Sequence, residues 1–119
     1  MMADALVVQR SDQFPLEVIE LKGPLTEANA AIFQNAMRRE EPAETVILDF
    51  SEVPYIDSSG LGILLTAYVT RQKAGRKMVL SGINSRVKKL CEVTRTGGLF
   101  LMFSTPEEAI ATLWGAARA

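Results

Sequence analysis

The stretch from Val46 to Leu65 constrains the fold most, because a buried strand runs into a helix within it. It begins with VILDF, a short apolar run rich in β-branched residues, which is typical of a strand buried on both faces of a parallel sheet. Pro54 cannot donate to a β ladder, so residues 53–56 are expected to leave the sheet. The stretch therefore predicts a strand, a short exit and a helix that starts at Asp57.

The periodicity becomes helical after this exit. Apolar residues recur at the spacing of one helix face, which is expected to extend to about Gly75: Leu61, Leu64, Leu65, Tyr68 and Val69. Asp57 is the expected N-cap, with Ser58 in the first turn. Gly60 and Gly62 lie in or beside that turn, although glycine costs about 1 kcal/mol relative to alanine inside a helix. Either they only allow tight packing against the strand, or the bare helix start admits another surface or an anion.

The N-terminal part of the chain predicts a hairpin and a helix. Residues 6–9 and 16–22 are expected to be strands that pair antiparallel across a polar turn at 10–14. Residues 26–39 are expected to be helical, and Glu40, Glu41 and Pro42 to close the helix. Its inward face is predicted to contain Ala28, Ala31, Ile32, Ala36 and Met37.

The C-terminal part predicts two more strands and two more helices. Residues 77–81 are expected to be a strand after the helix end at Gly75, and residues 85–93 a helix capped by Asn84. Residues 99–103 predict the last strand. Ser104 or Thr105 with Pro106 is expected to open a final helix. The apolar stripe of that helix is predicted to be Ala109, Ile110, Leu113 and Trp114.

This alternation of strands and helices predicts an α/β fold. We expect a mostly parallel sheet of four to five strands, an antiparallel N-terminal edge hairpin and about four helices. Sites in such folds gather at the carboxyl ends of the strands, so Asn84 and Ser85 in the turn at 82–86 are expected beside residues 54–62. With 119 residues, 48% of them hydrophobic, and no linker or repeat, one domain over residues 1–119 is expected.

The composition narrows the possible chemistry, because the chain has one cysteine and no histidine. Cys91 has no partner for an internal disulfide, and its spacing with Val87 and Leu90 places it on the inner face of a helix. We expect no metal and no cofactor, since nitrogen and sulfur ligands are scarce and the acids lack calcium-loop spacing. No enzyme activity is expected, because a serine hydrolase would need a histidine base and a G-x-S-x-G elbow.

The net charge of −1 is unevenly distributed. Residues 1–57 carry eleven acids and four bases, whereas residues 71–95 carry eight bases and one acid. A basic block raises the question of nucleic-acid binding, but this one has no interleaved aromatic residues, and solvated helix faces account for its charges. We therefore expect no nucleic-acid partner. The basic side chains on those predicted faces are Arg71, Lys73, Arg76, Lys77, Arg86, Lys88 and Lys89.

The longest apolar run, near residues 61–69, is too short to cross a bilayer. The first ten residues lack the basic region and apolar stretch of a signal peptide. We therefore expect no membrane insertion and a cytoplasmic location.

The hexapeptide at residues 57–62, DSSGLG, with the VILDFSEVPYI strand before it, resembles the signature of the STAS domain family, specifically bacterial anti-sigma factor antagonists. The order and spacing of the other elements agree with that family over nearly all of the chain. The resemblance implies that a partner kinase, which is also the anti-sigma factor, phosphorylates Ser58, and that a phosphatase acts on the phosphorylated form. The expected partner-binding residues are Asp57, Ser59, Gly60, Leu61, Gly62, Thr26, Asn84 and Ser85.

Thr26 departs from the family pattern, because sigma-regulating members usually carry an aspartate at the start of the first helix. Thr26 is still expected to be a good N-cap, with Glu27 as an acid one residue later. Two functions stay open. The first is an anti-sigma factor antagonist whose unphosphorylated form binds the anti-sigma factor/serine kinase, releases a sigma factor and is switched off at Ser58. The alternative is a non-switching STAS accessory or scaffold subunit of a signalling or lipid-transport complex.

Overall fold

The computed structural model describes residues 5–13, 15–39 and 42–118 and arranges them around one five-stranded sheet. The strand order is β1-β2-β3-β4-β5, with β1 and β2 antiparallel and every other neighbouring pair parallel. The predicted α/β class and the antiparallel edge hairpin are thus confirmed. The elements are β1 Val7–Gln13, β2 Leu16–Lys22, the 3₁₀ turn η1 Glu27–Asn29, α1 Ala30–Met37, β3 Thr45–Glu52, α2 Ser58–Lys73, β4 Lys77–Ser81, α3 Ser85–Val93, the 3₁₀ turn η2 Gly97–Leu99, β5 Met102–Phe103 and α4 Pro106–Arg118.

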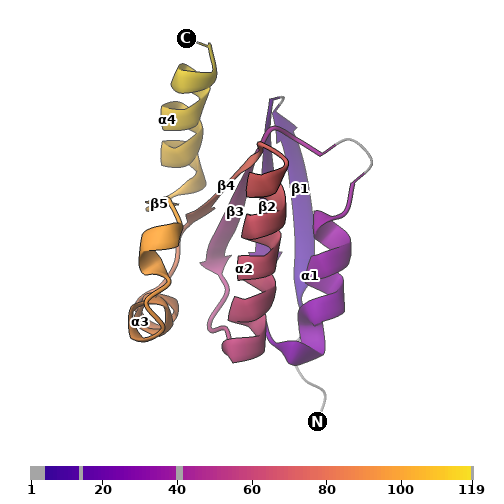
Figure 1. Ribbon diagram of the computed structural model, residues 1–119, viewed down its shortest axis with the longest axis vertical. Helices are drawn as coiled ribbons and strands as arrows, with labels where there is room; N and C mark the ends of the chain where they lie inside the picture. Colours follow the sequence, from indigo (N-terminus) through magenta and orange to yellow (C-terminus); the bar gives the residue numbers. More distant parts are fainter. Residues whose placement is uncertain (1–4, 14, 40–41, 119) are drawn as a thin grey trace.

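Helices cover both faces of the sheet, and β3 lies at its centre (Figure 1). α1 and α2 lie side by side over one face, where Leu48 and Phe50 join the main core. α4 packs against the other face, where Ala109 contacts a smaller core that contains Ile47 and Val79. The first six residues of β3 are buried, which confirms the prediction of a strand buried on both faces.

The N-terminal hairpin is longer than predicted. Residues 10–13 continue β1 and pair with residues 16–19 of β2, so the expected turn at 10–14 is wrong for the residues that are described; Phe14 lies outside them. An edge strand needs backbone pairing on one side only, and it tolerates polar residues because solvent reaches it. Arg10 of β1 is such a polar residue: its side chain is partly exposed, and its guanidinium forms an ion pair of 3.3 Å with the buried Glu17 of β2.

The helix expected at 26–39 is divided into the 3₁₀ turn η1 and the α-helix α1. Three residues per turn in η1 shift the phase of the helical residues after it. Phe33 and Ala36 therefore face the core, Met37 is partly buried, and the predicted inward positions Ala28, Ala31 and Ile32 are exposed. Glu40 and Glu41, which were expected to close the helix, lie outside the described residues.

β5 is shorter than the strand predicted at 99–103. It contains only Met102 and Phe103, which pair with Leu80 and Ser81 of β4. Glycine is unfavourable in strands, and the Gly97-Gly98 pair forms part of the turn η2 instead. The first half of β4 consequently has no β5 residue paired with it, and two leucines of this segment, Leu99 and Leu101, are 49% and 55% exposed.

Most of the remaining predictions are confirmed. Gly75 follows the end of α2 with a φ of 75°, in the left-handed region that favours glycine. The Thr105 hydroxyl accepts a hydrogen bond of 3.1 Å from the Glu108 N–H and so caps α4.

The predicted core residues are mostly buried as well. Cys91 is buried, and burial raises the pKa of its thiol. Val69 is an exception to the predicted apolar face of α2, because it is exposed at the edge of the buried stripe. In α4, Ala109 is buried, Ile110 and Leu113 pack beside it, and Trp114 is half-buried.

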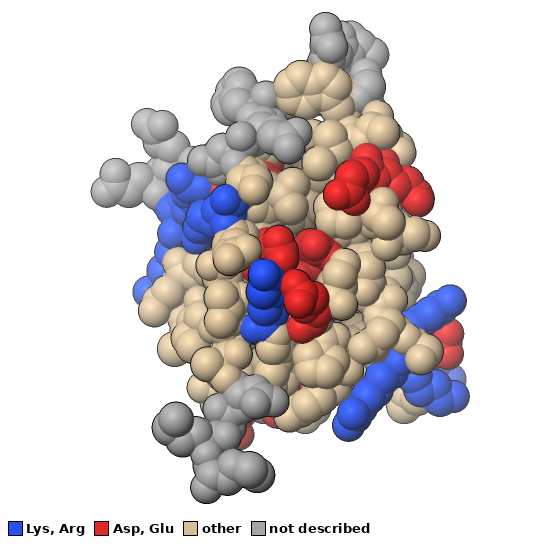
Figure 2. All heavy atoms as spheres, turned by 180° about the vertical axis from the view of Figure 1, so that it is seen from behind, with Lys and Arg blue, Asp and Glu red and all other residues tan. Residues whose placement is uncertain are grey.

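The basic block lies at the surface, with one exception. Figure 2 shows basic side chains gathered at one corner of the molecule, where α3 lies. Arg71 was expected to be solvated but is buried, and it donates hydrogen bonds to the carbonyls of Lys77 at 3.0 Å and Ala43 at 2.6 Å. Burial, with a contribution from the nearby charge of Arg76, lowers the Arg71 pKa to about 10. Arg71 therefore connects the end of α2 by hydrogen bonds to the start of β4 and to the segment before β3.

Among the described residues, every helix is either too short or too polar to cross a membrane.

Candidate functional site

Asp57 caps two helical segments at once. It has extended backbone geometry before α2, and its Oδ1 accepts a hydrogen bond of 2.7 Å from the Gly60 N–H. Its Oδ2 accepts a longer bond of 3.3 Å from the Glu27 N–H, at the start of η1. The predicted N-cap of α2 is thus confirmed, and the same carboxylate also fixes where the first helical segment begins.

Thr26 does not cap η1 as expected. It occupies the N-cap position, but its side chain makes no capping hydrogen bond. The Glu27 N–H, the first of the turn, donates instead to the Asp57 carboxylate of the neighbouring loop. The position that departs from the family pattern therefore lies beside Asp57 in the fold, and Glu27 adds an exposed acid there.

Gly60 is required by a close backbone contact. A Cβ at this position would lie 2.0 Å from the Leu25 carbonyl oxygen, which no side chain could tolerate. Leu25 is held there by a parallel bridge to Ile56, and its carbonyl accepts a hydrogen bond of 3.3 Å from the Asp57 N–H. Tight packing therefore explains Gly60, although the contact is with the segment after β2 rather than with a strand.

Gly62 differs from Gly60, because no described atom outside the local backbone of α2 lies within 4 Å of where its Cβ would be. Ser58, Ser59 and Gly62 are all exposed in the first turns of α2. Gly60 and Leu61 are buried, so they can support a contact surface but offer little area to a partner. The open helix start therefore consists of two hydroxyls and one bare backbone position beside the Asp57 carboxylate.

Asn84 brings the turn after β4 to the same edge of the sheet. Its Nδ2 donates to the carbonyls of Val53 at 3.2 Å and Pro54 at 3.0 Å, in the segment that leaves β3. Its Oδ1 accepts from the Val87 N–H at 2.8 Å, which confirms the predicted cap of α3. Ser85 follows as an exposed residue. The two predicted segments therefore meet at the carboxyl ends of β3 and β4.

Two further residues of this edge lie in the predicted segments 54–62 and 82–86 but were not named as site residues. The Arg86 guanidinium lies over the Tyr55 ring, 4.8 Å from its centroid, in a cation–π contact between α3 and the exit of β3. Neither residue has a motif around it. The signals that could have found them were their places in the two segments expected to meet here and the place of Arg86 in the basic block.

The arrangement is suited to binding. Within residues 5–13, 15–39 and 42–118, no group of three His, Cys, Asp or Glu side chains could hold a metal ion. The edge offers an exposed helix N-terminus with the hydroxyls of Ser58 and Ser59. The Asp57 carboxylate lies beside them, and α3 contributes the Arg86 guanidinium. Such a surface can bind a protein and can carry a phosphate.

Comparison with known proteins agrees with this architecture. The model of the STAS domain family matches residues 5–109. The anti-sigma-B factor antagonist of Listeria monocytogenes is 30% identical over 78 residues, which are 64% of this chain and 68% of that protein.

Solved structures share the fold. A sulfate transporter family protein from Wolinella succinogenes has a TM-score of 0.80 at 21% identity, covering 90% of this chain and 91% of that one. The anti-sigma factor antagonist SpoIIAA in its unphosphorylated form has a TM-score of 0.72 at 24% identity, covering 92% and 97%. The phosphorylated form of the Bacillus protein gives 0.67 at 22% identity, covering 90% and 99%. On the family match over nearly the whole described chain, the protein belongs to the STAS domain family.

Proposed function

We propose that this protein is an anti-sigma factor antagonist controlled by phosphorylation of Ser58. The observation that carries the proposal is the exposed Ser58 hydroxyl at the N-terminus of α2, beside a carboxylate that is itself fixed by two backbone N–H groups. In its unphosphorylated form the protein binds an anti-sigma factor that is also a serine kinase, and a sigma factor is released. The names of the Listeria and Bacillus relatives support this choice of partner.

The proposed contact surface is the edge built around Asp57. Ser58, Ser59 and Gly62 form its exposed centre, Asn84 and Ser85 extend it toward α3, and Thr26 lies beside it. Gly60 and Leu61 hold the helix start in place from below. The protein acts by binding, and the kinase supplies the chemistry; a phosphatase returns phosphorylated Ser58 to the binding form.

A phosphate at Ser58 would act through charge, without a change of fold. It adds roughly −1.5 to −2 charges at neutral pH, and a helix N-terminus stabilises an anion by about 0.3–1 kcal/mol. Asp57 holds its place because both of its oxygens accept backbone hydrogen bonds, so like charges accumulate on the surface that the partner contacts. Like charge at an interface costs several kcal/mol, which corresponds to a loss of affinity of about a hundredfold or more.

The test measures the intact mass of the protein from its native cells and identifies the kinase-like proteins that co-purify with it. A phosphate on the wild type that is absent from Ser58→Ala, with the kinase retained by Ser58→Ala, is the expected result. Ser58→Asp should bind the kinase about a hundredfold less tightly. Ser59→Ala is the matched control for the site of modification, because Ser59 is a neighbouring exposed hydroxyl, and the protein should still carry the phosphate. Equal kinase binding by Ser58→Asp and wild type would refute the proposal.

The second candidate is a non-switching accessory or scaffold subunit of a signalling or transport complex. The similarity in fold to a sulfate transporter family protein favours it. Thr26, at the position where sigma-regulating members usually carry an aspartate, leaves room for this function without deciding between the two. It predicts that Ser58 is unmodified under every growth condition and that transporter or scaffold subunits co-purify in place of a kinase. The same mass measurement and the same co-purified proteins decide between the two functions.

A further inference from the structure

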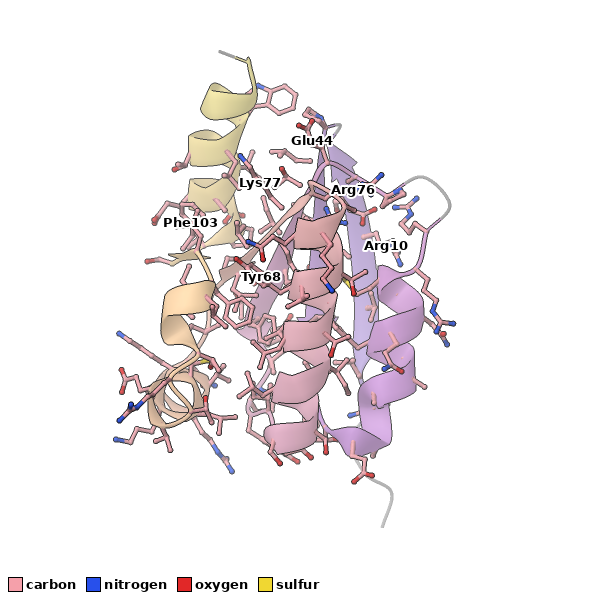
Figure 3. The ribbon with its side chains drawn as sticks, in the orientation of Figure 1. Arg10, Glu44, Tyr68, Arg76, Lys77 and Phe103 are labelled. Carbon is pink, nitrogen blue, oxygen red and sulfur yellow. The ribbon has the colours of Figure 1, made fainter. Side chains whose placement is uncertain are left out.

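A cavity of about 290 Å³ lies between α2, the first half of β4 and the segment that leads into α4. Its apolar lining includes Met78, Val79, Leu101 and Leu113, and Tyr68 contributes a ring with a polar tip. Figure 3 places Tyr68 and Lys77 between α2 and α4. Ten residues of helix separate Tyr68 from Ser58, or about 15 Å, so this cavity is distinct from the edge proposed to bind a kinase.

The cavity exists because β5 is short. The N–H groups of Leu80 and Gly82 point toward the β5 segment and donate to the carbonyls of Leu101 and Phe103, each at 3.0 Å. Backbone groups alternate sides along a strand, so the N–H of Met78 points to the same side as that of Leu80. The ladder between β4 and β5 stops at Leu80, and among the described residues none of its hydrogen bonds reaches Met78. Met78 lines the cavity and is only 3% exposed, and the described chain supplies no acceptor for its N–H. Buried backbone N–H groups almost always have an acceptor, so this donor is available to a ligand.

Two cations line the same cavity. Arg76 and Lys77 are consecutive residues at the start of β4, and neither forms an ion pair with any carboxylate in the part of the chain that the structure describes. The mouth is apolar, because Leu99 and Leu101 are about half exposed there. The cavity thus combines a positively charged rim, an unused N–H donor and a lining that water solvates poorly.

We propose that this cavity binds a small amphiphilic carboxylate, that is, a free organic acid with a carboxylate head and an apolar chain or ring. The carboxylate lies at the Arg76–Lys77 rim, where it accepts charge-assisted hydrogen bonds, and the Met78 N–H offers it a further donor. The apolar part lies against Val79, Leu101 and Leu113 and covers the leucines that are now exposed. At about 290 Å³ the cavity is at the small end of ligand sites, so the ligand is a small molecule rather than a peptide.

The proposal is tested with sodium octanoate as the probe, titrated into the full-length protein labelled with ¹⁵N and followed by NMR. We expect saturable shifts with a Kd on the order of 1 mM, confined to residues around Tyr68, Met78, Leu101 and Leu113. Octan-1-ol, which keeps the chain and lacks the charge, should bind about tenfold more weakly. A second cavity of about 260 Å³ lies between α1 and α2 and is lined by residues such as Phe33, Met37 and Ile63. Absence of saturable shifts, shifts centred on that second cavity, or equal binding of octan-1-ol would overturn the proposal.

Two pairs of variants locate the site. Arg76→Gln with Lys77→Gln should weaken octanoate binding about tenfold, whereas Lys73→Gln with Lys88→Gln removes the same charge from outside the cavity and should change it less than about twofold. Leu101→Glu should abolish binding, and Val93→Glu, at an exposed valine of α3, should not. These positions are at the surface, and an unchanged amide spectrum of each variant verifies its fold.

A final arm separates a free acid from a membrane lipid. Vesicles of phosphatidylglycerol, mixed with the protein and pelleted, should leave it in the supernatant. Pelleting that octanoate fails to compete away would show that the cations serve a membrane surface, and the proposal would be wrong.

Discussion

The dual capping role of Asp57 makes its replacement by alanine the most informative substitution. Loss of an N-cap side chain costs about 1 kcal/mol, and the bond to the Glu27 N–H adds about 0.5 kcal/mol because it is long and exposed. We therefore expect Asp57→Ala to lower the free energy of unfolding by about 1.5 kcal/mol. This corresponds to a fall in Tm of about 6 °C for a domain of this size.

The two capping bonds can be separated experimentally. Asp57→Ser keeps one acceptor for the Gly60 N–H but lacks the second oxygen that reaches Glu27, so it should cost only about 0.5 kcal/mol. Thr26→Ala is the matched control, because the Thr26 side chain makes no capping bond, and it should cost less than about 0.5 kcal/mol.

Urea unfolding at neutral pH gives these free energies, and amide hydrogen exchange shows where each bond is lost. In Asp57→Ala the amides of Gly60 and Glu27 should both exchange faster, whereas in Asp57→Ser only Glu27 should. If Asp57→Ala proved no more destabilising than Thr26→Ala, or if the Glu27 amide kept its protection in Asp57→Ala, the dual cap would be refuted.

Further predictions concern three other buried features. Gly60→Ala should destabilise the protein by about 3 kcal/mol or more, because its Cβ would collide with the Leu25 carbonyl. Gly62→Ala, at an open helical position, should instead stabilise the protein by about 0.5–1 kcal/mol. Urea unfolding measures both free energies, and equal effects of the two substitutions would contradict the close contact at Gly60. Arg71→Lys should cost about 1–3 kcal/mol in the same assay, because an ammonium lacks the planar fork that reaches two carbonyls, whereas Arg38→Lys at an exposed position should be neutral. Cys91 should resist a thiol reagent at pH 8 until urea unfolds the protein, since burial shields the thiol and raises its pKa; rapid labelling of the native state would contradict its placement in the core.

The parts of this fold that could be predicted are those whose signals are local. β3 is recognised by its apolar run, α2 by Asp57 and its periodicity, and α3 by Asn84, because each signal lies within a few residues of the element that it defines. The predicted edge was likewise correct in bringing Asn84 to the segment after β3, since parallel topology alone requires that.

The errors arose where distant segments decide the outcome. Residues 10–13 look like a turn, yet pairing with β2 makes them a strand. Thr26 looks like a side-chain cap, yet it makes no capping bond, and the first N–H of the turn donates to a carboxylate from another loop. Arg71 looks like a solvated cation, yet two carbonyls from other segments bury it. In each case the deciding partner comes from another segment of the chain, and only the folded structure brings the two together.

The hydrogen bonds that build the Asp57 edge also determine when it can form. Asp57 to Glu27 and Asn84 to Pro54 each join residues about 30 positions apart, so the first bond requires β2 and β3 to be aligned and the second requires β3 and β4. Contacts between residues distant in sequence are slow to form because the entropy of closing the intervening loop opposes them. The edge is therefore completed late in folding, and a chain still emerging from the ribosome presents no finished surface until the residues after β4 have been made.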